Sequence, residues 1–279
     1  MPSVEQNIKR WDSKFKDFIQ DEDYGYRWSM AWGSPLLQWY STIFPRVVNC
    51  LPVQHIYEIG SGLGRWSEFL MNYCKYLTLS DISDQSIRFL EKNYGKNKKV
   101  RVVKTIGNKI TAKSKIDFLF SFDSLVHCDY DIICDYIDEF EVNASEKSNY
   151  FFHHSNLASC SIEVSEKKQN GWRSKNVSYI NVRKKISEKR LGLVSQELID
   201  WGAVVDYLDC MTLISNLHNQ KPIFIENNKF MNNARKVNAI KGKIYKYYKT
   251  IYLLRRLNLL PLRIEKVIIS KVNKKYGIN

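Results

Sequence analysis

The stretch IYEIGSGLGRW, residues 56–66, decides the fold of this 279-residue chain. An apolar run leads into three glycines in the pattern GxGxG, which are Gly60, Gly62 and Gly64, and an amphipathic segment follows. Glycine lets the backbone turn sharply and lie flat against a ligand, whereas a Cβ would hold the ligand away. A strand, a glycine loop and a helix in this order indicate a cofactor site where the strand ends.

Short apolar segments alternate with amphipathic segments along the chain that surrounds this loop. Strands that alternate with helices predict an α/β fold. The runs are apolar throughout, as the strands of a sheet covered on both faces require. We therefore expect a Rossmann-like, doubly wound, mainly parallel sheet of seven strands. The expected strands are residues 55–60, 76–82, 100–105, 116–125, 149–156, 190–199 and 210–215.

The charge of the chain is unevenly distributed. Residues 221–279 hold 15 lysines and arginines against two acids, which accounts for +13 of the total formal charge of +14. Any contact with a polyanion or a membrane surface is therefore expected in this last part of the chain. We predict an N-terminal helical lid or cap over residues 1–52, a Rossmann-like core over 53–219, and a basic helical C-terminal extension over 220–279.

A helix is expected over residues 239–256 of this extension. Its apolar face is too large to be left in water, so it must be buried against something. Three interpretations stay open, namely packing on the protein's own core or a second subunit, docking at an anionic membrane surface, and an anionic soluble partner. The expected apolar face consists of Ile240, Ile244, Tyr247, Ile251 and Leu254, and the basic face of Lys243, Lys246, Lys249 and Arg256.

The composition excludes several classes of protein. A hydrophobic fraction of 44% and an aromatic fraction of 13% are typical of an ordered globular protein. The six cysteines contain no CxxC pair, so neither a disulfide framework nor a zinc ribbon is expected. The chain opens without an apolar leader, and no run approaches the ~20 apolar residues of a membrane span. We expect a cytoplasmic protein, with peripheral contact at the inner membrane face left open by the basic extension.

Acidic residues stand on either side of the glycine loop. In a nicotinamide fingerprint, GxGxxG, the third glycine would fall at position 65, which is Arg65 here. Asp81 ends the second expected strand, where a carboxylate accepts hydrogen bonds from both ribose hydroxyls of a bound nucleoside. This arrangement resembles motif I, and the acid that follows it, in class I S-adenosylmethionine-dependent methyltransferases. The resemblance implies S-adenosyl-L-methionine as cofactor, held by Glu58, Gly60, Ser61, Gly62, Gly64, Asp81 and Ile82.

Further segments resemble a bacterial family of methyltransferases found with polysaccharide and surface-glycan assembly genes. The more specific strings are FSFDSLVH, residues 120–127, and HHSNL, residues 153–157. The resemblance implies O-methylation of a sugar or a sugar-linked group in the synthesis of a capsule or O-antigen type of polysaccharide. It covers most of residues 30–215, through residues 32–46, 56–70, 77–83, 118–131, 151–157 and 195–202.

Three histidines are candidates for the base that removes a proton from a sugar hydroxyl. His127, His153 and His154 lie at or just past the ends of the fourth and fifth strands, where ligands bind in open α/β sheets. The segment around His127 is similar to the histidine-aspartate segment of plant phenolic O-methyltransferases, whose histidine is the base. His153 and His154 are adjacent in a strand, so they point to opposite faces. Asp123 is expected to orient His127, contact the acceptor or help to hold a cation.

Two residues are candidates for binding the acceptor. Asn156 follows the fifth strand and is expected to hydrogen-bond a sugar hydroxyl or to orient a histidine. Trp32 lies beside Gly33, and two interpretations stay open for it. Its ring either covers the adenine or a sugar ring as part of a lid, or packs a helix onto the sheet.

Several alternatives accompany the sugar O-methyltransferase hypothesis. The acceptor is expected to be a sugar, a nucleotide sugar or a glycan, or a phosphate or phosphoramidate substituent of the glycan. A nucleic-acid methyltransferase is disfavoured because FDSLVH, residues 122–127, replaces an Asn/Asp-Pro-Pro-aromatic motif and residues 1–220 are nearly neutral. A non-catalytic scaffold that docks a membrane or an assembly complex is a third alternative. A divalent cation and a homo-oligomer stay open, although no metal-specific spacing is present.

Overall fold

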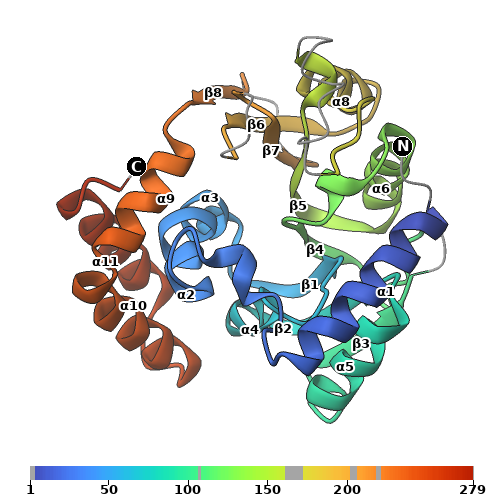
Figure 1. The fold of residues 1–279 in the computed structure, drawn as a ribbon. Coiled ribbons are helices and arrows are strands. Elements are labelled where there is room, and N and C mark those ends of the chain that lie inside the picture. Colours follow the sequence, from blue (N-terminus) through green and yellow to red (C-terminus); the bar gives the residue numbers. More distant parts are fainter. Residues whose placement is uncertain (1–3, 106–107, 161–171, 202–205, 218–220, 279) are drawn as a thin grey trace.

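The computed structural model describes residues 4–105, 108–160, 172–201, 206–217 and 221–278 (Figure 1). One eight-stranded sheet with the order β3-β2-β1-β4-β5-β7-β6-β8 forms its centre. The strands are β1 (Val53–Ile59), β2 (Cys74–Asp81), β3 (Val100–Lys104), β4 (Ile116–Ser121), β5 (Ala144–Ser155), β6 (Gly192–Ile199), β7 (Asp209–Ser215) and β8 (Ile223–Asn227).

The strand directions confirm the predicted Rossmann-like sheet. The strands pair in parallel except around β7, which runs antiparallel to both β5 and β6. All seven expected strands are present, but the predicted number of strands is wrong because β8 pairs in parallel with β6 and adds an eighth. The apolar run of β8, residues 223–225, lies exposed at the sheet edge, within the segment predicted as a basic helical extension.

Alternate side chains of the strands enter two separate cores. Phe118 and Phe120 of β4 lie in one core, and Leu119 between them lies in the other. This alternation follows from the period of two residues in a strand. The second core is closed by α6 (Tyr130–Asn143) and α8 (Tyr179–Ser187). The sheet is therefore covered on both faces, as its apolar strands required.

The first core is closed by two helical parts far apart in the sequence. One is a run of short helices, α2 (Pro35–Gln38), the π-helix η2 (Trp39–Ile43) and α3 (Phe44–Val47). Ser34 caps this run, because its hydroxyl accepts a 3.2 Å hydrogen bond from the Leu37 N–H. The other part consists of α9 (Phe230–Ala239), α10 (Lys241–Arg256) and α11 (Leu262–Lys275).

The apolar side of α10 differs by one residue from the predicted stripe. Ile244, Tyr248 and Ile251 are buried in the first core, whereas Tyr247 is 49% exposed. The prediction was wrong for Tyr247 because the helix turns Tyr248, one position later, toward Tyr40 of η2, with ring centroids 5.3 Å apart. The helix therefore packs on the protein's own core.

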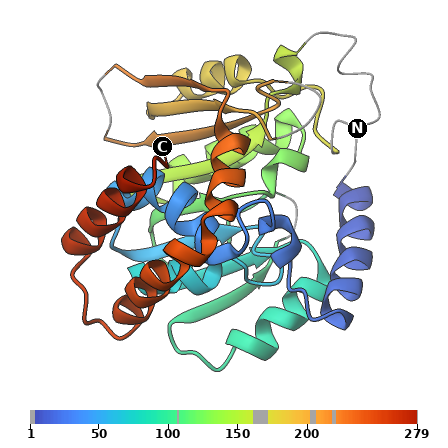
Figure 2. The same cartoon turned by 60° about the vertical axis from the view of Figure 1, so that its left-hand side comes forward.

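A buried acid joins α11 to the rest of this core. The Glu265 carboxylate accepts hydrogen bonds from the hydroxyls of Tyr73, at 2.6 Å, and Tyr40, at 3.1 Å. Asn273 donates to the Tyr40 carbonyl and accepts from Tyr248. The described part of the C-terminal extension, residues 221–278, thus packs on the core. Figures 1 and 2 place α9, α10 and α11 on one side of the molecule and α1 (Val4–Gln20) on the opposite side.

Candidate active site

A cavity lies beside the glycine loop, at the carboxyl ends of β1, β2 and β4. It encloses about 960 Å³, including the part that opens to solvent, and this is within the size range of small-molecule sites. Its position agrees with the crevice in which open α/β sheets bind ligands. The predicted site residues that line it are Gly60, Ser61, Gly62, Asp81, Ile82, Asp123 and His127.

The glycine loop has the conformation that its sequence requires. Gly60, Gly62 and Gly64 have φ values of 66°, 56° and 84°, in the left-handed region that favours glycine. A Cβ on Gly60 would lie 1.9 Å from the Ser124 hydroxyl oxygen, so no other residue can stand there without moving the segment after β4. The loop is therefore pressed against the end of β4, and its backbone faces the cavity.

The buried carboxylate of Asp81 holds the loop in place. The Asp81 carboxylate accepts hydrogen bonds from the N–H groups of Gly62, at 2.8 Å, and Ser83, at 2.9 Å. Burial raises the pKa of Asp81. Each carboxylate oxygen has two lone pairs, so Asp81 keeps capacity to accept hydrogen bonds from a ligand in the cavity.

Glu58, which was predicted to help hold the cofactor, does not line the cavity. Its carboxylate lies beneath the loop and accepts a 2.6 Å hydrogen bond from Ser67, at the start of α4 (Ser67–Leu70). Burial raises the pKa of Glu58 to about 8 in spite of that hydrogen bond. Gly64 does not line the cavity either. It faces Tyr94, because a Cβ there would lie 2.8 Å from the Tyr94 hydroxyl oxygen. Both residues shape the loop from behind.

The arginine that replaces a third fingerprint glycine lines the cavity. Nη2 of Arg65 lies 2.7 Å from the carboxylate of Asp123, and both side chains are nearly buried. The Arg65 guanidinium also lies over the ring of Trp66, 4.5 Å from its centroid. Nη1 is buried without a hydrogen-bond partner among the described residues. Because an unpaired buried donor is costly, this atom marks a place for an acceptor atom of a ligand.

His127 lies in the cavity wall in the tautomer that a base needs. Its Nδ1 is 3.2 Å from the carbonyl oxygen of Trp172, which accepts and so fixes the proton on Nδ1. Nε2 then carries the lone pair. Burial and, to a lesser extent, the charge of Arg173 lower the pKa of His127 to about 4. His127 is therefore neutral near pH 7, so its Nε2 is unprotonated.

His153 points away from the cavity and forms part of a buried charge cluster. Its ring packs between Phe122 and Trp201, and its Nε2 lies 3.2 Å from the Asp209 carboxylate. Arg173 holds the same carboxylate through two nitrogens, at 2.6 and 3.0 Å. Burial acts to raise the pKa of Asp209, but the charge of Arg173 lowers it well below the ordinary value.

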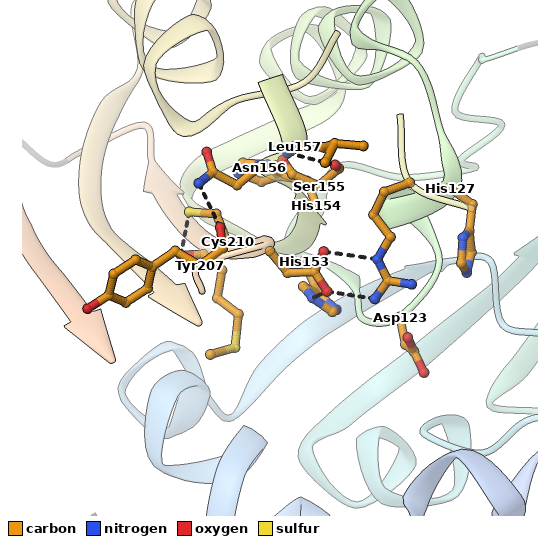
Figure 3. A network of polar contacts seen from close by, with 12 residues as sticks. Asp123, His127, His153, His154, Ser155, Asn156, Leu157, Tyr207 and Cys210 are labelled. Atoms are coloured by element: carbon orange, nitrogen blue, oxygen red, sulfur yellow. Dashed lines mark hydrogen bonds and ion pairs between the residues drawn. The ribbon is translucent and has the colours of Figure 1, made fainter. Parts of the chain in front are cut away.

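His154 and Asn156 also lie outside the cavity, so the structure does not support their predicted roles. His154 faces the opposite side of β5 from His153, as the strand period predicts, and is bridged by Thr212 and the Ser155 carbonyl. Both functional groups of Asn156 are used, because its amide donates to the Tyr207 carbonyl and accepts from the Tyr179 N–H. Figure 3 shows His127 set apart from His154 and Asn156.

Trp32 is a core residue and not a lid residue. It is 2% exposed, and its ring lies 5.6 Å from the rings of both Trp201 and Phe230. Within residues 1–52, which were predicted to form a helical lid or cap, α1 is the helix that lines the cavity. Trp11 and Phe15 of α1 line the cavity together with Trp28. Their spacing of four residues on α1 is the signal that could have singled them out.

Helix α1 is fixed at both ends of the cavity. Its Asp12 accepts a hydrogen bond from Ser83, which lies close to Asp81, the acid expected to bind the ribose. Its Asn7 donates to the His127 carbonyl and accepts from the indole N–H of Trp172. The lid therefore contacts the same segment that orients the candidate base. Within the described part of the chain, no group of three or more histidines, cysteines and acids is placed to hold a metal ion.

Comparisons with known proteins agree with this geometry. Residues 57–137 match the family profile described as a methyltransferase domain. No curated protein matches the chain. The N-methyltransferase NodS from Bradyrhizobium japonicum WM9, solved with S-adenosyl-L-homocysteine, is similar over 67% of this chain and 90% of its own, with 16% identity and a TM-score of 0.52.

A second solved structure shares the same part of the fold. It is an S-adenosylmethionine-dependent methyltransferase from Clostridium acetobutylicum ATCC 824, with 13% identity, a TM-score of 0.51, and coverage of 64% of this chain and 90% of its own. These likenesses show the fold, and the family match places a methyltransferase domain on the glycine loop. Residues 57–137 therefore match a methyltransferase domain, and the chain shares the fold of solved S-adenosylmethionine-dependent methyltransferases.

Proposed function

We propose that this chain is an S-adenosylmethionine-dependent methyltransferase and that it transfers a methyl group to a hydroxyl oxygen of a sugar or sugar-linked acceptor in the synthesis of a surface polysaccharide. The observation that supports methyl transfer to oxygen is the state of His127. It is a neutral imidazole in the cavity wall, and its Nδ1 is held by a backbone carbonyl. The sugar class of the acceptor rests on the sequence resemblance around residues 118–131 and 151–157.

The residues of the cavity suit S-adenosyl-L-methionine. The glycine loop lines the cavity at Gly60 and Gly62, and Asp81 offers acceptor oxygens to the ribose hydroxyls. Nη1 of Arg65 is a buried donor that suits the carboxylate of the methionine part. The cofactor, when bound, supplies an electrophilic methyl group on a sulfonium ion.

His127 then supplies the general base. A sugar hydroxyl is a poor nucleophile, and a positioned base that accepts its proton typically contributes ~10²–10⁴-fold to the rate. The carbonyl of Trp172 keeps Nε2 of His127 unprotonated, and the proton moves from the acceptor oxygen to this atom. The charge of Asp123, which lines the same cavity, favours the imidazolium that forms. Asp123 is itself held by Arg65.

The aromatic wall of the cavity favours a ring-shaped acceptor. Trp11 and Trp28 present ring faces, and their centroids lie 5.8 Å apart in an edge-to-face arrangement. Indole rings bury apolar faces of a ligand while their N–H groups stay available to polar partners. The pyranose ring has such apolar faces of C–H bonds, which supports a sugar over a flexible aliphatic acceptor.

The test is a transfer assay with methyl-labelled S-adenosylmethionine and panels of nucleotide sugars, glycans, phosphorylated glycans, amines and RNA. We expect label on a sugar oxygen, resistant to mild base and located by NMR, and an equal rate in EDTA. Label on a phosphate would favour the phosphate alternative, in which His127 matters less because that oxygen is already anionic. Label on nitrogen, the atom named for NodS, or on RNA would overturn the proposal.

A further inference from the structure

We infer that the corner between α10 and α11 docks the protein on an anionic lipid bilayer. This corner presents five apolar side chains that are between 42% and 65% exposed, all within residues 253–267. Single exposed apolar residues are ordinary on a protein surface, but several at one helix corner indicate a binding surface. The five, here called the apolar corner, are Leu253, Leu257, Leu259, Ile264 and Val267.

The fold beneath the apolar corner keeps these side chains in solvent. Ile251, Leu260 and Ile269 of the same segment are buried in the first core. The Leu259 N–H donates a 2.8 Å hydrogen bond to the Leu254 carbonyl, and the Asn258 N–H donates to that of Arg255, so the turn closes α10 firmly. The apolar corner therefore cannot turn inward without breaking the core.

The surroundings of the apolar corner are basic. Between residues 227 and 279 the chain has one acid, Glu265, and that side chain is fully buried and bound by two tyrosines. Exposed cations on the two helices have no acidic neighbour in this segment to neutralise them. The exposed basic residues of α10 and α11 are Lys241, Lys243, Lys246, Lys249, Arg256, Arg263, Lys266, Lys271, Lys274 and Lys275.

The positive charge of this segment indicates which partner fits the apolar corner. A second copy of the chain would bring two segments of +13 charge together, which opposes a dimer through this face. A nucleic acid suits the cations but has no use for five exposed aliphatic side chains. An anionic bilayer suits both, since the leucines enter the headgroup boundary while the lysines and arginines contact lipid phosphates.

The contact would be peripheral. Among the described residues no helix is both long and apolar enough to cross a membrane. Instead, each basic residue near an anionic leaflet strengthens partitioning by about fivefold, which corresponds to about 1 kcal/mol. This docking surface lies on the side of the molecule opposite α1 (Figures 1 and 2). The cavity and its lid therefore stay accessible to an acceptor while the chain is bound.

Co-sedimentation of the full chain with phosphatidylcholine vesicles, with and without phosphatidylglycerol, tests the inference. We expect binding to anionic vesicles that weakens strongly between 50 mM and 500 mM salt, because salt screens surface charges. Arg256→Gln with Arg263→Gln should weaken partitioning by about 25-fold. Leu257→Ser with Leu259→Ser should also weaken it and leave the melting temperature unchanged, because both side chains are exposed.

Two matched controls carry the same changes elsewhere on the surface. Lys96→Gln with Lys98→Gln removes exposed charge beside β3, and Val142→Ser with Leu217→Ser removes exposed apolar side chains. Both controls should bind vesicles like the wild type. The inference is overturned by equal binding to neutral and anionic vesicles, by controls that weaken binding as much as the test variants, or by a dimer that the Leu257 and Leu259 changes dissociate.

Discussion

Two groups of histidines stand at the carboxyl ends of neighbouring strands, and only one reaches the cavity. His127 follows β4 in the short helix η5 (Leu125–His127), beyond the sheet edge, and lines the cavity. His153 and His154 are still inside β5, so their side chains enter the layers on either side of the sheet. A residue past the end of a strand can face the crevice, whereas a residue within it faces a core.

The two groups also differ in the hydrogen bonds made by their ring nitrogens. His127 has one fixed nitrogen and one nitrogen without a protein partner among the described residues, which suits proton transfer. His154 has both nitrogens bridged, which suits a structural role. Burial lowers the pKa of both to about 4, so a perturbed pKa alone does not tell a base from a structural histidine.

The largest expected effect is on turnover, and it distinguishes His127 from the two histidines of β5. His127→Ala should lower kcat by ~10²–10⁴-fold and leave the affinity for S-adenosylmethionine nearly unchanged, because a base acts on the acceptor proton. His154→Ala, the matched control, should lose stability and keep kcat per folded molecule. If turnover per folded molecule falls in His154→Ala or His153→Ala but not in His127→Ala, the assignment of the base is wrong.

The next effect concerns the buried cluster behind the cavity. Asp209→Ala leaves the Arg173 guanidinium without its buried carboxylate and should lower the free energy of unfolding by about 3–5 kcal/mol, measured by urea denaturation. Asp138→Ala removes a partly exposed carboxylate from Lys185 and Lys189 and should cost about 0–1 kcal/mol. Equal losses in the two variants would contradict a structural role for the Asp209 cluster.

The smallest effect is a pH dependence of stability from His154. Its pKa is about 4 when folded and about 6.5 when unfolded, so between these values the unfolded chain binds the proton and the folded chain does not. The wild type should therefore lose about 1.4 kcal/mol per pH unit relative to His154→Gln as the pH falls from 6.5 to 4. A constant difference between the two proteins over this range would mean that His154 is not held neutral.

Much of the fold could be predicted because it depends on local signals. The apolar runs located seven strands, and GxGxG with Asp81 located the cofactor loop, since each glycine answers a local backbone requirement. The position of β8 depended on its pairing with β6 across the sheet edge, and its exposed apolar run carries no local mark of that partner.

The acceptor side of the site was harder to predict from the sequence. Asn156 and Trp32 have residue types that suit a sugar, but distant partners such as Tyr207 and Phe230 occupy them. Trp11 and Arg65 line the cavity because α1 folds back over the loop, which is a tertiary contact. Asp209 of β7 meets Arg173, which lies 36 residues earlier in the sequence, only through the tertiary fold.

Calorimetric titration with S-adenosylmethionine tests the central claim, that the cavity beside the glycine loop binds the cofactor. Asp81→Asn and Asp81→Ala should weaken binding by on the order of tenfold or more, because the hydrogen bonds lost from a buried acceptor are worth about 1–3 kcal/mol. Asp84→Ala, three positions along and in an exposed ion pair with Lys104, should bind like the wild type. Wild-type affinity in folded Asp81→Ala, or no binding by the wild type itself, would contradict the account.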